Sequence, residues 1–245
     1  MIYLKEFATA QDYEDVKNNL PKPNVSLITD GSEVKYMKET TPPTPVEHEY
    51  VDLGLPSGTL WATMNIGASS ITDTGLYYQW GDTQGYLYNE HEWGESTYKW
   101  FDVENDVYTK YNYTDGKRGL DDADDAAIAA WGNGWHIPTK AQFVELIDED
   151  NVTTAWTTDY QGSGVSGLVI TSRINNNTLF LPSNMSWGDG RYRSNATYDQ
   201  GNNDGGYEYC VGLLIGDWEP EVVDEHSLGS LYRRDGHGIR PVKDA

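Results

Sequence analysis

Side chains suited to binding gather between Trp187 and Cys210, in a stretch that is almost free of aliphatic residues. Large aromatic side chains supply contact area and stack on sugar rings, while small polar side chains supply adaptable hydrogen bonds. We therefore predict a loop surface that binds a glycan or a protein, joined by three residues further along the chain. The predicted ligand-binding residues are Trp187, Arg191, Tyr192, Arg193, Asn195, Tyr198, Asp199, Asn202, Asn203, Trp218, Tyr232 and Arg233.

A more ordinary interpretation assigns part of these aromatic side chains to the core. Tyr207 and Tyr209 alternate with Glu208 directly before an apolar run, which is typical of a strand with one buried side. The single cysteine, Cys210, opens that run. Free cysteines are among the most buried residues, so we predict a buried, unreactive thiol.

Catalytic motifs find little support in the sequence. One cysteine excludes a disulfide framework and a cysteine metal cluster. The five histidines form no His-x-x-x-His pair, and no Gly-x-Ser-x-Gly elbow is present. Acidic residues are plentiful, so a carboxylate pair for glycoside hydrolysis stays open as an alternative. We predict a binding protein that is not an enzyme.

The densest acidic cluster is Asp121–Asp125, written DDADD. It lacks the spacing and the glycine of a calcium-binding EF-hand loop. Several aspartates at the start of a helix are also explained by the helix dipole. We therefore expect no cofactor, with calcium binding as a remaining alternative.

Charge and composition limit the partners of the 245-residue chain. Its 39 acidic and 17 basic residues give a net charge of −22, which repels nucleic acid and anionic membranes. No apolar run approaches the length of a membrane span, and the N-terminus lacks the basic and apolar regions of a signal peptide. We expect no nucleic-acid partner, no membrane insertion, and synthesis in a bacterial cytoplasm without a signal peptide.

A proline- and threonine-rich segment divides the chain. We predict a module over 1–39, a stiff linker over 40–48 and a large domain over 49–245. In the module, a helix follows Thr9 and a β-hairpin flanks the sequence TDGS. One helix and one hairpin bury too little to be stable alone, so this module should attach to a partner. The predicted attachment residues are Phe7, Tyr13, Val16, Leu20, Val25, Leu27, Val34 and Tyr36.

The large domain mixes short strands, few helices and long loops, which indicates an α+β class. Thr139 and Gln142 form a capping box before the apolar stripe of a helix. The run DDADDAAIAAWG predicts a second, acid-capped helix. Two strands joined by a Pro-Ser-Gly turn are predicted over 50–67, a hairpin over 166–183, and closing strands in YCVGLLIG and GHGIRPVKD.

The motif order in this domain resembles the Fibrobacter succinogenes major paralogous domain. The matching stretches are YVDLGLPSGTLWATMNIGA, YYQWGD, AAWGNGWHIPTKAQFVELI, FLPS and GHGIRPVKD. The resemblance implies a C-type-lectin-like fold, with two helices around a small twisted antiparallel sheet, ends close together and a loop face that binds ligands. The segment RYRSNATY departs from the family's Tyr-Trp-Ser-Ser pattern, and Glu219-Pro220-Glu221 matches the lectins' calcium triplet only in part.

The N-terminal sequence FATAQDYEDVKNNLPKPNVSLITDGSEVKY resembles the short first module of virion structural proteins from phages of gut Bacteroides, including crAss-like phages. Both resemblances together imply a non-enzymatic protein of the virion surface. Residues 1–39 would attach it to other virion proteins, and the lectin-like domain would bind host-surface or mucus glycans or proteins. A homo-oligomer is expected, with a trimer as the guess. A bacterial surface adhesin and a glycan hydrolase remain the alternatives.

Overall fold

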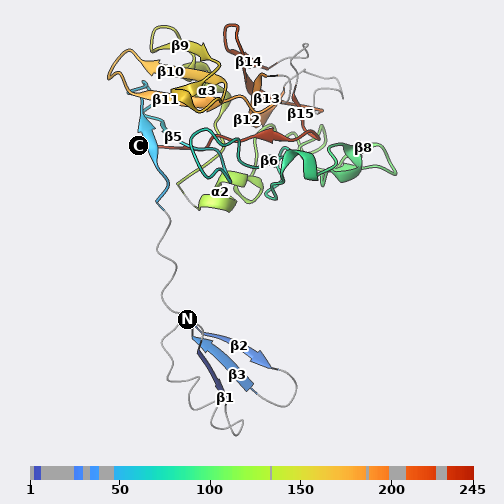
Figure 1. Cartoon of the computed structure of the whole chain (residues 1–245). Coiled ribbons are helices and arrows are strands. Elements are labelled where there is room, and N and C mark those ends of the chain that lie inside the picture. The colour runs from blue at the N-terminus through green and yellow to red at the C-terminus, as the bar shows by residue number, and fades with distance from the viewer. Residues whose placement is uncertain are drawn as a thin grey trace. The chain divides into compact units, whose positions relative to one another are not determined.

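The structure, a computed structural model, describes residues 3–6, 25–29, 34–38, 47–132, 134–185, 188–198, 208–224 and 231–245. It divides into two compact units, Met1–Glu47 and His48–Ala245. The boundary falls at the end of the proline-rich segment (Figure 1). Most of the described chain that has regular structure is strand, in several small sheets with few helices.

The first unit contains a three-stranded antiparallel sheet in the order β1–β3–β2. Its strands are β1 (Tyr3–Glu6), β2 (Val25–Thr29) and β3 (Val34–Lys38). The β2–β3 pairing confirms the predicted hairpin, and β1 adds a strand that the sequence pattern did not predict. Because residues directly opposite share a face, the register places Val25, Leu27, Val34 and Tyr36 on one face. The predicted helix with Tyr13, Val16 and Leu20 lies outside the described residues, as does the predicted attachment residue Phe7.

The second unit is organised around a six-stranded sheet in the order β14–β13–β12–β16–β6, with β15 also paired to β13. The strands are β6 (Tyr77–Tyr78), β12 (Gly190–Thr197), β13 (Tyr209–Ile215), β14 (Glu221–Val223), β15 (Leu231–Tyr232) and β16 (His237–Gly238). Strand β12 pairs antiparallel with β13 and parallel with β16. It therefore runs through the interior of the sheet.

Three smaller sheets complete the unit. They are β11–β10–β9, β17–β5–β4 and β7–β8. The strands are β4 (Tyr50–Asp52), β5 (Leu60–Ala62), β7 (Phe101–Asp102), β8 (Val107–Tyr108), β9 (Val152–Thr157), β10 (Gly167–Ser172), β11 (Thr178–Pro182) and β17 (Val242–Lys243). The pairing of β4 with β5 confirms the two predicted strands joined by a turn, and the β10–β11 pairing confirms the predicted hairpin. Since β4 and β17 both pair with β5, the beginning and end of this unit lie close together.

Two α-helices carry the caps that the sequence predicts. Helix α3 (Lys140–Leu146) begins after Thr139, and both bonds of the capping box with Gln142 are present. Helix α2 (Ala126–Trp131) begins after Asp125, whose carboxylate accepts the N–H groups of Ala127 and Ile128. The short 3₁₀ helices are η1 (Tyr88–Glu90), η2 (Glu95–Thr97), η3 (Asp122–Asp124) and η4 (Tyr160–Gly162).

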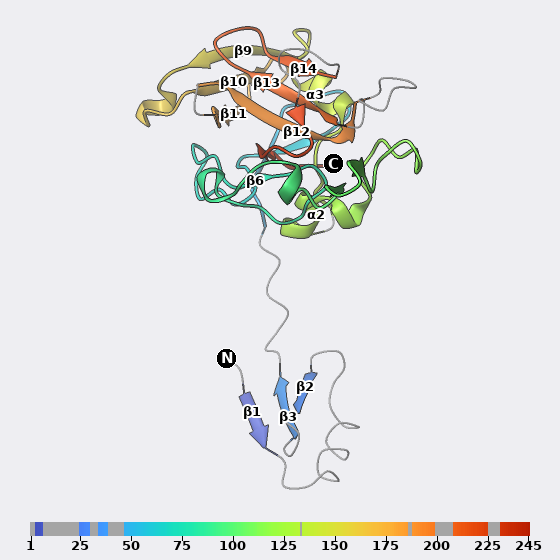
Figure 2. The ribbon, with the colours of Figure 1, turned by 90° about the vertical axis from the view of Figure 1, so that its right-hand side faces the viewer.

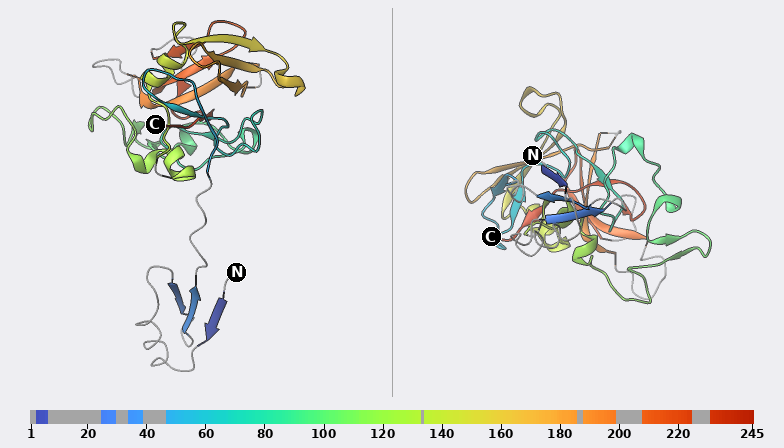
Figure 3. Two further views of the ribbon diagram at one scale, coloured as in Figure 1. Left: turned by 90° about the vertical axis from the view of Figure 1, so that its left-hand side faces the viewer. Right: turned by 90° about the horizontal axis from the view of Figure 1, so that it is seen from below.

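The main hydrophobic core surrounds α3. Phe143 and Leu146 are fully buried against apolar side chains of β10, β11, β12 and β13. A second cluster packs α2 near β6, and a third gathers around Trp80 and Cys210. The views in Figures 1 and 2 and the left view of Figure 3 place the β9–β11 sheet and α2 on opposite sides of this unit. Among the described residues, no helix is long and apolar enough to cross a membrane.

The stretch from Gly190 to Thr197, which the sequence led us to expect as a loop, is the interior strand β12. Its apolar content is low, but its tyrosine and arginine side chains are long enough to fill core space. Two of them, Tyr192 and Arg193, are almost completely buried. The loop expectation was therefore wrong for this part of the stretch.

Candidate functional site

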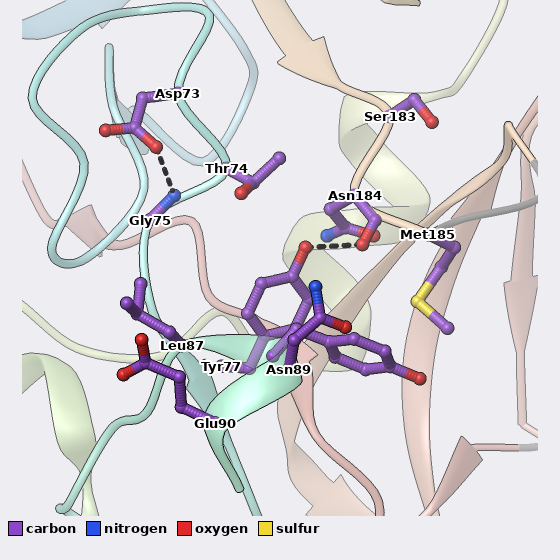
Figure 4. A pocket seen from close by; sticks show the side chains of 11 residues that line it. Asp73, Thr74, Gly75, Tyr77, Leu87, Asn89, Glu90, Ser183, Asn184 and Met185 are labelled. Carbon is purple, nitrogen blue, oxygen red and sulfur yellow. Dashed lines mark hydrogen bonds between the residues drawn. The ribbon is translucent and has the colours of Figure 1, made fainter.

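A cavity of about 500 Å³ lies beside β6, within the usual range for small-molecule sites. One wall comes from residues 73–90 and the other from 183–185 (Figure 4). The lining residues are Asp73, Thr74, Gly75, Tyr77, Leu87, Tyr88, Asn89, Glu90, Ser183, Asn184 and Met185. The lining thus combines two aromatic rings with carboxylates, amides, hydroxyls and apolar groups.

The loop that holds Asp73 is fixed by its own carboxylate. One oxygen accepts the N–H and hydroxyl of Ser69 at 2.8 Å each, and the other accepts the N–H of Gly75 at 3.0 Å. Gly75 has a φ of +70°, and a Cβ there would lie 2.4 Å from the carbonyl oxygen of Ile66. Only glycine fits this turn without strain.

A buried arginine supports the same loop from inside the unit. The Nε of Arg240 donates to Oδ1 of Asn65 at 2.8 Å, and Nδ2 of Asn65 donates to the carbonyl of Thr74 at 2.9 Å. Both side chains are completely buried. Arg240 belongs to the GHGIRPVKD segment, so the end of the chain positions a wall of the cavity through Asn65.

Two tyrosines form the aromatic part of the cavity. Tyr77 lies on β6, and its backbone N–H and carbonyl both pair with Tyr86, which brings residues 87–90 alongside. The rings of Tyr77 and Tyr88 have centroids 4.9 Å apart. The indole N–H of Trp93 donates to the carbonyl of Tyr88 at 2.8 Å, and its ring stacks on that of Tyr88. Tyr88 is therefore held in place while remaining half-buried.

The opposite wall is held by Asn184. Its side chain accepts the N–H of Arg191 at 2.8 Å and donates to the carbonyl of the same residue at 2.9 Å. The hydroxyl of Tyr77 donates to the carbonyl of Asn184 across the cavity (Figure 4). This bond joins the two walls, so the cavity is a built feature of the fold rather than a gap between loops.

Charge in the cavity is negative. Partial burial by itself raises the pKa of Asp73, but the hydrogen bonds from Ser69 and Gly75 outweigh it and hold the pKa below its ordinary value. Asp73 is thus ionised at neutral pH. Glu90 and Asn89 are exposed at the rim. The arrangement can accept hydroxyl groups and cover a sugar ring with an aromatic face, but it does not favour an anionic ligand.

Three of the residues that we predicted on a binding surface are buried: Tyr192, Arg193 and Arg233. Tyr192 packs in the α3 core and donates its hydroxyl to the carbonyl of Pro182 at 2.7 Å. Arg193 donates to the Sγ of Cys210 at 2.8 Å and to backbone carbonyls of Tyr232 and Asp235. Their assignment to a ligand face was wrong, because β12 lies inside the sheet and the side chains on both of its faces are covered.

Arg233 has a different buried environment. Its guanidinium lies 4.8 Å from the ring centroids of both Trp80 and Tyr108. It donates to the hydroxyl of Tyr98 at 2.9 Å and to the carbonyls of Tyr111 and Lys110. The aromatic rings and carbonyls together replace water around the charge, so Arg233 is structural.

The other predicted ligand-binding residues that the structure describes lie on several different elements. Arg191, Asn195, Tyr198 and Tyr232 are half-buried. Arg191 lies 3.5 Å from a carboxylate oxygen of Asp189 at the start of β12, while the Tyr232 ring packs at a tilt against Tyr209 at the start of β13. Trp218 is half-exposed in the turn after β13. Trp187, Asp199, Asn202 and Asn203 lie outside the described residues.

Calcium binding at the acidic cluster Asp121–Asp125 was an open alternative, but protein donors bind the carboxylates of Asp124 and Asp125. Asp124 accepts Lys110, Lys99 and the hydroxyl of Tyr111. Asp125 caps α2 and also accepts the N–H of Ile137 at 2.9 Å. Within the described ranges, no group of three or more histidine, cysteine or acidic side chains could hold a metal ion.

The buried thiol of Cys210 confirms the sequence prediction. Burial raises the pKa of this thiol, which disfavours the reactive thiolate.

The cavity itself was not predicted. The sequence did carry a signal for one wall of the cavity. The segment YLYNEHEW combines aromatic, amide and acidic residues, as does the stretch from Trp187 to Cys210 that we predicted to bind ligands. No protein-family model, no curated protein and no solved structure matches the chain. The site is therefore interpreted from its geometry.

Proposed function

We propose that the second unit binds a neutral glycan in the cavity between residues 73–90 and 183–185. The observation that carries this proposal is the pairing of the Tyr77 and Tyr88 rings with carboxylate, amide and hydroxyl groups in one cavity. Aromatic faces pack on the C–H surfaces of sugars, and carboxylates and amides bind their hydroxyls. The net charge of −22 weakens binding of sulfated or acidic glycans.

We further propose that this unit is C-type-lectin-like and that the chain serves as a virion surface protein. The fold proposal is supported by the motif resemblance, by the two capped helices and by the close approach of the unit's ends. Attachment to other virion proteins is assigned to residues 1–39. Its support is the resemblance of that segment, the division of the chain into two compact units and the common face of Val25, Leu27, Val34 and Tyr36.

A glycan hydrolase is the second candidate, because Asp73 and Glu90 both line the cavity. Glycosidases use one carboxylate as a general acid whose pKa is raised. Asp73 has the opposite shift and its oxygens are engaged by backbone donors. Asp73 is therefore unsuited to the role of general acid, which would fall to Glu90 at the exposed rim of the cavity.

The test uses the full chain and neutral oligosaccharides of one to six units, built from N-acetylglucosamine, mannose or glucose. We expect binding to at least one series and no release of shorter sugars during prolonged incubation. Absence of binding to every series would overturn the glycan proposal. Release of shorter sugars that is lost in Glu90→Gln would replace it with the hydrolase.

A further inference from the structure

We infer that the ligand is an extended oligosaccharide, which runs from the cavity across the start of β12 to a second aromatic subsite at Trp218. This inference rests on the proposed glycan function and specifies its ligand. It starts from the position of Trp218, which is 50% exposed in the turn between β13 and β14.

The ring of Trp218 is fixed against the backbone. A Cβ added at Gly216 would lie 2.2 Å from the indole ring, so the ring rests directly on the glycine. One ring face is thus covered by protein, and the half-exposed side chain leaves the rest available to solvent. Asp217 and Glu219, on either side, are exposed carboxylates. A supported aromatic ring between two hydroxyl acceptors is the same chemistry as in the cavity.

Direct contacts connect the cavity wall to this turn without interruption. The hydroxyl of Ser183 donates to the carbonyl of Asp189 at 2.7 Å, and the N–H of Asn184 donates to the same oxygen at 3.1 Å. The next residue, Gly190, pairs with Ile215, and a Cβ at Gly190 would lie 2.6 Å from the Ile215 side chain.

Gly216 follows Ile215 directly, and the Trp218 ring packs on Gly216. The cavity wall and the turn therefore lie next to each other at the same end of β12 and β13, joined through residues that are themselves buried.

The separation of the two subsites excludes a single sugar unit as the common ligand. Asn184 occupies both backbone polar groups of Arg191, so it lies on the side of β12 that faces away from β13. Crossing from Asn184 over β12 to β13 takes two strand spacings, about 10 Å. A ligand that contacts both Tyr88 and Trp218 must span at least this distance, which requires several linked sugars.

The experiment measures affinity against chain length for the same three sugar series, with the full chain. Trp218→Ala is compared with Tyr88→Ala and with Tyr113→Ala, a control in which an exposed tyrosine outside both subsites is removed. Trp218→Tyr, which keeps an aromatic face, tests whether the effect comes from stacking. Thermal unfolding of each variant shows whether the fold is retained.

We expect wild-type affinity to rise with chain length and then level off. Trp218→Ala should lower the affinity for the longer sugars about tenfold and leave that for monosaccharides unchanged, and Trp218→Tyr should restore most of it. If Tyr88→Ala weakens binding but Trp218→Ala changes nothing at any length, the extended ligand is overturned and the cavity proposal stands. If Tyr88→Ala changes nothing, the cavity proposal itself fails.

Discussion

The Arg233 site and the cavity beside β6 are both rich in aromatic side chains, but the first is filled and the second is open. At Arg233, the rings of Trp80, Tyr98 and Tyr108 surround a guanidinium whose donors end on a tyrosine hydroxyl and backbone carbonyls. At the cavity, the rings of Tyr77 and Tyr88 border a volume of about 500 Å³. The first site is closed by its own side chain, and the second stays open.

Amino-acid composition alone therefore does not separate a structural cluster from a binding site. Tyrosine and arginine have long side chains with polar ends, so they fill a core wherever a backbone acceptor is in reach. Arg193 and Arg233 both find such acceptors. The cavity has no arginine among its lining residues, and it leaves a space that a ligand can enter.

We expect the largest loss of stability at Tyr192, a predicted ligand-binding residue that the structure buries. Tyr192→Ala removes a fully buried ring from the α3 core and should lower the free energy of unfolding by about 3–5 kcal/mol. Urea denaturation of the variant and the wild type measures this difference. Unchanged stability together with weaker glycan binding would contradict the burial of Tyr192 and would support its predicted role in ligand binding.

Arg233→Met should have the next largest effect. The substitution keeps an apolar stem but leaves the carbonyls of Lys110 and Tyr111 without their guanidinium donors. We expect a loss of about 3 kcal/mol in the free energy of unfolding, since buried acceptors without donors cost about 1–3 kcal/mol each. The same denaturation experiment applies, and a loss below about 1 kcal/mol would show that the aromatic rings close this site without the charge.

A smaller effect should appear as a pH dependence of stability. Burial, together with the charges of Arg193 and Arg191, holds the pKa of His237 well below 6.5. Below about pH 6.5 the unfolded chain therefore binds a proton at His237 that the folded chain does not bind. The stability contribution of His237 is thus fully present above that pH. It should fall on acidification by at most about 1.4 kcal/mol per pH unit.

The control for this slope is His237→Gln, studied between pH 7 and pH 5. Burial raises the pKa values of Asp125 and Asp235, which act in the opposite direction but equally in both proteins. The wild type should lose more stability than the variant over this range. Identical slopes would mean that His237 titrates normally and that its surroundings are not dry.

Local signals in the sequence predicted much of the secondary structure. The capping box of Thr139 and Gln142 and the Asn-rich turn of the β10–β11 hairpin involve residues close in the chain. Propensity and periodicity act over such distances. The strand β12 was missed because its residues Arg191 to Asn195 lack the alternation of apolar and polar side chains that marks a half-buried strand.

The site was harder to predict, because its walls come from distant segments. Tyr77 and Asn184, which bond across the cavity, are 107 positions apart in the sequence. The loop at Gly75 is positioned through Asn65 by Arg240, near the end of the chain. No local pattern specifies that these segments meet, whereas the exposed position of Trp218 does agree with the sequence prediction.

The most direct test of where the glycan binds compares two tyrosines in one binding measurement. Tyr88 lies in the cavity, and Tyr198 follows β12 on the surface that the sequence favoured. With a neutral oligosaccharide that binds the full chain, isothermal titration calorimetry should show at least a tenfold weaker affinity for Tyr88→Ala. Tyr198→Ala should bind as the wild type does. Weak binding by Tyr198→Ala with normal binding by Tyr88→Ala would contradict the assignment of the site.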